Sequence, residues 1–186
     1  MNIYDFDKTI YDGDSTADFI FYCAGKYKKT LLWVFPTVCA FIPYAAGLRT
    51  KTRFKERMYG FLKFVPNVDE AVRAFWEEHE KNIFDYYKKQ RREDDIIISA
   101  SPEFLLAPIC ERLGIKRLIA SRVDKRTGKY TGENCWGAEK VKRLKEKYGI
   151  ERCDEFYSDS YSDTPLAEIA DKAYIVKRDG PAPWGA

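Results

Sequence analysis

Short apolar runs separated by helical patterns are the feature that most constrains the fold of this 186-residue chain. Five runs are interpreted as strands: Ile3–Phe6, Ile96–Ser99, Leu118–Ser121, Glu155–Ser158 and Ala173–Val176. Each is almost continuously apolar or aromatic, as expected of a strand buried on both faces. Helical patterns cover Glu103–Leu113 and Ala138–Tyr148, and a glycine that can end the helix follows each. This alternation predicts a parallel α/β sheet.

A long segment, 13–92, separates the first two predicted strands. A connection of this length cannot be a plain loop, and its apolar residues recur at helical spacing. We therefore predict two parts: a core formed by 1–12 and 93–186, and a helical subdomain formed by 13–92.

Within this insertion, Leu31–Leu48 contains no charged residue, and basic residues stand on both sides of it. Its length approaches that of a membrane span, but Pro36 and Pro43 argue against one straight helix. We favour a buried helical hairpin. A surface that meets anionic lipid through the apolar segment and its basic flanks stays an open alternative.

Composition excludes several classes of protein. The chain is 45% hydrophobic and 33% charged, which indicates a globular protein, and its net charge of +3 is too small to indicate a nucleic-acid partner. Five scattered cysteines without a Cys-x-x-Cys pair, and no signal peptide in the first twelve residues, predict a cytoplasmic location. With His79 as the single histidine, any metal needs oxygen ligands.

The pentapeptide Asp5-Phe6-Asp7-Lys8-Thr9 stands at the end of the first predicted strand. Residues two apart on a strand point the same way, so Asp5 and Asp7 are expected to converge where parallel sheets bind ligands. Paired carboxylates at that place suit a hard metal ion or acid–base chemistry.

Four further polar residues fall at the same edge of the predicted sheet. Ser99 and Asp159 end two strands, Asp163 lies in the loop after the second of them, and Lys140 opens a helix. Each alone could be a turn residue, a helix cap or a solvated surface residue. Together they predict one site.

In order and spacing, these residues resemble the motifs of the haloacid dehalogenase superfamily and its phosphoserine-phosphatase-like subclass. The four motifs match Asp5-x-Asp7-x-Thr9, Ser99, Lys140 and Asp159-x-x-x-Asp163. The resemblance spans nearly the whole chain. It implies an α/β fold with a Rossmann-like parallel sheet, helices on both faces and an all-helical cap at the position of 13–92.

The resemblance also implies a Mg²⁺-dependent phosphatase that forms an aspartyl-phosphate. Asp5 would be the nucleophile, and Asp7 would be the general acid and base. Mg²⁺ would be held by the carboxylates of Asp5 and Asp159 and by the backbone carbonyl of Asp7.

The other matched residues have supporting roles in that scheme. Thr9 would fix the turn, while Ser99, the backbone at Ala100, and Lys140 would bind the phosphoryl oxygens. Asp163 would orient Lys140 or a metal-bound water.

Substrate choice is expected to come from the cap. By resemblance, Asp14 would bind a substrate amine and Arg57 a substrate carboxylate, although Asp14 could equally cap a helix and Arg57 lie on an exposed face. Lys8, Asp12 and the apolar segment depart from phosphoserine phosphatases, and the Asp7-Lys8-Thr9 form together with the hydrophobic cap also resembles relatives that act on lipid phosphates. The predicted partner is a phosphorylated small molecule or lipid. A phosphotransferase with the same intermediate, or an inactive module that binds membranes or partners, stays open, and oligomeric state is not readable from the sequence.

Overall fold

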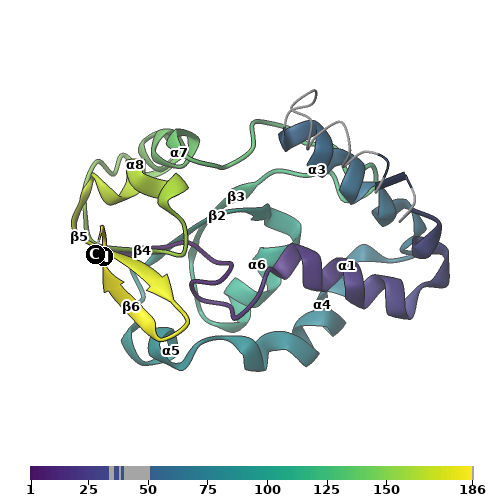
Figure 1. The fold of residues 1–186 in the computed structure, drawn as a ribbon, viewed down its shortest axis with the longest axis horizontal. Coiled ribbons are helices and arrows are strands. Elements are labelled where there is room, and N and C mark those ends of the chain that lie inside the picture. The colour runs from purple at the N-terminus through teal and green to yellow at the C-terminus, as the bar shows by residue number, and fades with distance from the viewer. Residues whose placement is uncertain (34–35, 38, 40–50, 186) are drawn as a thin grey trace.

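A six-stranded sheet organises the computed structural model, which describes residues 1–33, 36–37, 39 and 51–185 (Figure 1). The strands are β1 (Asn2–Tyr4), β2 (Ile96–Pro102), β3 (Arg117–Ser121), β4 (Cys153–Ser158), β5 (Ala170–Lys177) and β6 (Gly180–Pro183). Their order is β3-β2-β1-β4-β5-β6; neighbouring strands pair in parallel except β6, which is antiparallel to β5. The predicted parallel α/β sheet is confirmed. Strand β6 was not predicted, because Gly-Pro-Ala-Pro lacks a strand pattern and prolines occur in sheets only at edges.

The described elements between β1 and β2 are all helical. They are α1 (Ser15–Lys26), α3 (Lys51–Tyr59), α4 (Val68–His79) and α5 (Asp85–Gln90), with 3-10 turns η1 (Lys28–Trp33), η2 (Gly60–Phe64) and η3 (Glu80–Asn82). After β2 come α6 (Glu103–Arg112), α7 (Ala138–Tyr148), η4 (Tyr161–Asp163) and α8 (Thr164–Ala167). Both helices predicted in this second half are present, and α7 ends at Gly149 in the left-handed conformation.

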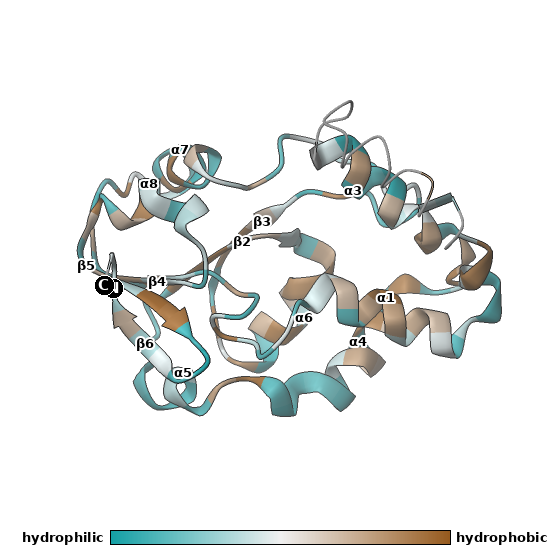
Figure 2. Cartoon of the chain, in the orientation of Figure 1, coloured by the Kyte–Doolittle hydropathy of each residue, from teal (hydrophilic) through white to brown (hydrophobic). Residues whose placement is uncertain are grey.

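The insertion shares a hydrophobic core with the sheet. Phe19 and Phe75 from the insertion belong to the same buried cluster as Ile97 of β2. Trp76 on α4 is fully buried, and its indole Nε1 donates a hydrogen bond of 2.6 Å to the carbonyl of Leu105 on α6. Figure 2 shows the apolar residues that α1 and α6 carry. The inserted helices are therefore packed onto the core, although the proposed division at 13 and 92 stays a prediction.

The apolar segment Leu31–Leu48 falls mostly outside the described residues, which include only 31–33, 36–37 and 39 of it. The predictions of a buried hairpin and of membrane contact through 31–48 are therefore not tested by the structure. In the part of the chain that is described, no helix combines the length and apolar character needed to cross a membrane.

A loop between β3 and α7 joins the core to the insertion. The Tyr130 N–H donates to Glu56 Oε1 on α3 at 3.0 Å, and Lys125 forms an ion pair of 2.5 Å with Asp69 on α4. Gly128 has a φ of +72° and lies against the backbone of Tyr59, which leaves no space for a side chain. This loop thus helps to hold α3 above the C-terminal edge of the sheet.

We expect Gly128→Ala to destabilise the protein more than Gly149→Ala. Both glycines have a positive φ, so an added Cβ costs about 1–2 kcal/mol at either position. At Gly128 the Cβ would also lie 2.6 Å from the Tyr59 carbonyl oxygen, whereas nothing lies within 4 Å at Gly149. Urea denaturation measures both losses. Equal losses would show that the contact with Tyr59 does not fix the loop.

Candidate active site

The nucleophile motif lies in a turn rather than in a strand. Strand β1 ends at Tyr4, and the Asp5 N–H extends the pairing with β4 by donating to the Tyr157 carbonyl at 2.9 Å. The predicted strand Ile3–Phe6 is therefore two residues too long, and strand alternation does not bring Asp5 and Asp7 together. They converge because the chain turns immediately after Asp5.

The turn is built around the carbonyl of Phe6, which accepts the N–H groups of residues 9–11. Lys8 has a φ of 55°, in the left-handed region that residues other than glycine rarely adopt. Thr9 is fully buried, and its carbonyl accepts the hydroxyl of Tyr86. These contacts are consistent with the predicted role of Thr9 in fixing the turn.

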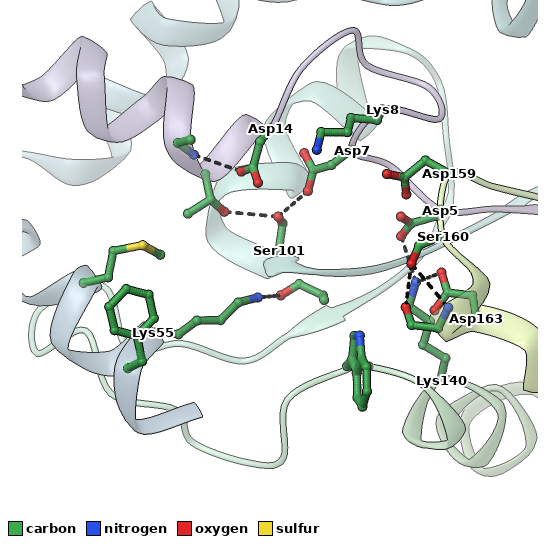
Figure 3. A pocket seen from close by; sticks show the side chains of 17 residues that line it. Asp5, Asp7, Lys8, Asp14, Lys55, Ser101, Lys140, Asp159, Ser160 and Asp163 are labelled. Atoms are coloured by element: carbon green, nitrogen blue, oxygen red, sulfur yellow. Dashed lines mark hydrogen bonds and ion pairs between the residues drawn. The ribbon is translucent and has the colours of Figure 1, made fainter. Parts of the chain in front are cut away.

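A cavity of about 340 Å³ lies at the C-terminal edge of the sheet, and its lining includes Asp5, Asp7, Asp14, Ala100, Lys140, Asp159 and Asp163. The carboxylates of Asp5, Asp7 and Asp159 point into the same space (Figure 3). The structure thus brings together most of the residues that the sequence placed at one edge. Ser99, Thr9 and Arg57 are not among the lining residues.

Lys140 is the buried centre of a charge network. Its Nζ lies 2.8 Å from Asp5 Oδ1 and 2.7 Å from Asp163 Oδ2, and the Ser158 hydroxyl donates to Asp163 Oδ2 at 2.8 Å. Burial alone would lower the pKa of Lys140, but the charges of Asp5 and Asp163 outweigh it and raise this pKa. The ammonium therefore stays charged. Asp163 contacts Lys140 as predicted and makes no side-chain cap on α8.

Asp7 is held in place by two donors. The Ser15 N–H donates to Asp7 Oδ1 at 2.7 Å, and the Ser101 hydroxyl donates to Asp7 Oδ2 at 2.5 Å. Burial, and then the charge of Asp14, raises the pKa of Asp7 to about 7, although both hydrogen bonds oppose the rise. A carboxyl group with a pKa near neutrality can both donate and accept a proton, as a general acid and base must.

Ser101 is a site residue that the sequence analysis missed. It lies two residues after Ser99 in β2, lines the cavity, and contacts Thr16 Oγ1 at 3.1 Å as well as Asp7. Ser99 is buried behind it, where its hydroxyl accepts the Ser101 N–H at 3.1 Å. The spacing of two along one strand was the available signal for Ser101. A direct role of Ser99 at the phosphate stays a prediction.

The two proposed metal-binding carboxylates influence each other. Asp159 is half-buried, and burial together with the charge of Asp5 raises its pKa to about 6. Burial also raises the pKa of Asp5, against the opposing charge of Lys140. A cation near Asp5 and Asp159 would relieve this repulsion, and both groups offer the oxygen donors that Mg²⁺ prefers.

The two residues expected to bind the substrate, Asp14 and Arg57, lie in different surroundings. Asp14 caps α1 by accepting the Ala17 N–H at 3.0 Å, and it also lines the cavity. Arg57 instead lies over the ring of Trp33, 4.8 Å from its centre, and is not among the residues that line the cavity, so its role at the substrate stays a prediction. Helix α3 presents Lys55, whose Nζ donates to the Ala100 carbonyl at 3.3 Å.

The fold and the site together define an α/β protein with a carboxylate active site at a sheet edge. A model of the haloacid dehalogenase-like hydrolase family matches residues 3–168. The chain therefore belongs to this family, as the motifs predicted.

Two curated relatives match a little under half of the chain. A protein of Mycobacterium tuberculosis named as a probable phosphatase is 36% identical over 94 residues, which cover 46% of this chain and 32% of that protein. Protein CicA of Caulobacter vibrioides is 39% identical over 94 residues, covering 47% and 42% respectively. The alignments thus span about a third to two fifths of the length of these relatives.

Solved structures share the fold over nearly the whole chain. A Bordetella pertussis protein of unknown function has a TM-score of 0.74 at 22% identity, covering 93% of this chain and 87% of that one. A phosphoserine phosphatase solved as a phospho-aspartyl intermediate analogue has a TM-score of 0.54 at 19% identity, covering 92% and 83%. The fold is therefore that of phosphoserine-phosphatase-like proteins.

We expect Lys140→Met to destabilise the protein by about 3–5 kcal/mol, because it leaves two buried carboxylates without their cation. Lys145→Met is the matched control on the same helix, since the Lys145 side chain is 66% exposed in its pair with Glu151. The control should change stability little. Urea denaturation compares the two variants, and similar stabilities would contradict the structural importance of the buried network.

Proposed function

We propose that the protein is a Mg²⁺-dependent phosphomonoester hydrolase that acts on a small or lipid-linked phosphate through an aspartyl-phosphate on Asp5. The observation that carries the proposal is that one cavity contains two carboxyl groups in different electrostatic environments. Asp5 is bound to the buried ammonium of Lys140, whereas Asp7 has a pKa of about 7. Family membership and relatives named as phosphatases support it.

The donor set fits a magnesium ion. Asp5 and Asp159 supply carboxylate oxygens, and the backbone carbonyl of Asp7 would be the third protein ligand. The described residues contain no cluster of three or more His, Cys, Asp or Glu side chains suited to a metal ion. Water and substrate oxygens would complete the coordination, as is usual for Mg²⁺. When bound, the ion would offset the repulsion between an anionic phosphate and the carboxylates.

In the first step, the Asp5 oxygen that is not paired with Lys140 attacks phosphorus. The bond from phosphorus to the ester oxygen breaks, its electron pair stays on that oxygen, and Asp7 donates a proton to it. The alcohol then leaves. Lys140 stabilises Asp5 and nearby phosphoryl oxygens as charge shifts.

In the second step, Asp7 is deprotonated and removes a proton from water. The water oxygen attacks phosphorus, the bond to Asp5 breaks, and phosphate leaves. The Ser101 hydroxyl positions Asp7 for both steps through its 2.5 Å hydrogen bond.

We expect the protein to release phosphate from an aryl phosphate only when Mg²⁺ is present. Asp5→Asn should reduce activity to background because it removes the nucleophile, and Asp7→Asn should reduce kcat about 10²–10⁴-fold because it removes the general acid. Colorimetric phosphate release measures each rate.

Asp12→Asn is the matched control, because Asp12 is an exposed carboxylate of the same turn outside the cavity lining. It should keep its activity. Turnover that survives Asp5→Asn, or that is unaffected by chelation of divalent ions, would contradict the mechanism.

A further inference from the structure

A second cavity, of about 170 Å³, lies within the inserted helices. Its walls include Ile20, Phe21 and Ala24 of α1, Trp33 of η1, Met58 of α3 and Phe61 of η2. The proposed reaction uses none of these residues. All of these side chains are apolar apart from the indole N–H.

The polar atoms in the described wall are already hydrogen-bonded within the protein. Thr30 Oγ1 donates to the Tyr27 carbonyl at 2.7 Å, and Thr37 Oγ1 donates to the Trp33 carbonyl at 2.8 Å. The indole Nε1 of Trp33 donates to the Arg57 carbonyl at 2.7 Å. A polar ligand would find few partners here, so the cavity suits an apolar group.

This cavity adjoins the catalytic cavity. Met58 lines both of them, so its side chain forms a common wall. On α1, Ala17 lines the catalytic cavity, and Ile20, Phe21 and Ala24 line the second one. These positions are three, four and seven residues after Ala17, which places all of them on one face of the helix. Met58 and one apolar face of α1 therefore contribute to both cavities.

The second cavity also reaches the surface. Phe21 belongs to its wall and is 74% exposed. An apolar chain longer than the cavity could therefore extend outward without displacing a buried side chain.

We infer that the substrate is an amphiphilic phosphate monoester, with its phosphate at Asp5 and its apolar chain lying past Met58 in the second cavity. This inference rests on the proposed phosphatase activity and specifies its substrate class. The apolar chain supplies binding energy to the complex by leaving water, and Lys55 and Met58 of α3 stand where phosphate and chain join.

The first test is kcat/KM for a series of linear alkyl phosphates from ethyl to octyl, kept below the concentrations at which they aggregate. Burial of each methylene is worth about 0.8 kcal/mol, so kcat/KM should rise about fourfold per methylene until the cavity is filled. Equal values for ethyl and octyl phosphate, with both hydrolysed, would overturn the inference and leave the phosphatase proposal intact.

A pair of variants tests where the alkyl chain of the substrate lies. Ala24→Leu places a larger side chain in the cavity and should lower the octyl-to-ethyl ratio of kcat/KM at least tenfold. Gly25→Leu adds the same side chain to the same helix where nothing lies within 4 Å, so it should keep the wild-type ratio. If Gly25→Leu lowered the octyl-to-ethyl ratio of kcat/KM, or if Ala24→Leu left it unchanged, the alkyl chain would lie elsewhere and the inference would be refuted.

Binding separates this inference from the proposed function. In the Asp5→Asn variant, calorimetric titration with Mg²⁺ should show octyl phosphate binding at least tenfold more tightly than ethyl phosphate, with the preference lost when Ala24→Leu is added. That result would support the chain site even if no phosphate ester were hydrolysed. Equal affinities would overturn it.

Discussion

The buried ammonium of Lys140 is the interaction on which the catalytic edge of the sheet depends. It joins Asp5, which follows β1, to Asp163 in the turn after β4, and it comes from a third element, α7. Burying the charge of each carboxylate in this network would cost much free energy without the cation. One side chain therefore fixes three segments that are remote in sequence, and the proposed nucleophile is held by the same contact.

The residues proposed to react with the phosphate and those proposed to select the ester come from different parts of the fold. Asp5, Asp7, Asp159 and Asp163 stand on the turns that follow β1 and β4, whereas α1 and α3 of the insertion contribute Ala17, Phe54 and Met58 to the apolar part of the wall. The insertion is nevertheless held firmly, because Trp76 joins it to α6 and the loop carrying Gly128 lies against Tyr59. A change in the apolar wall can thus alter which ester enters while the carboxylates keep their positions.

Much of the fold and site could be predicted because the relevant signals are local. Buried parallel strands are short apolar runs, and the polar residues that end them meet at one edge whatever the details of packing. This was sufficient to place Asp5 and Asp159, and Asp163 lies in the turn that follows Asp159. Lys140 could be selected only by resemblance, since Lys142 and Lys145 stand on the same helix and only burial against Asp5 distinguishes it.

The sequence could not show which residues of a helix or strand face the cavity. Arg57 and Lys55 are two residues apart on α3, which rotates one about 200° from the other, so only one of them faces the cavity. Sequence composition favoured neither. Ser101 was missed because its role depends on the distance to Asp7, a residue 94 positions away along the chain.

The sequence by itself determined the parallel sheet, the helical insertion and the set of carboxylates that we propose as catalytic, because strand patterns and short motifs are read from residues close together in the chain. Only the tertiary structure decided which lysine is buried, which serine holds Asp7 and which face of α3 meets the site. It also revealed that Met58 lines both the cavity of the carboxylates and a second, apolar cavity. These features depend on how distant segments pack, and packing creates the burial that sets each pKa and each cavity wall.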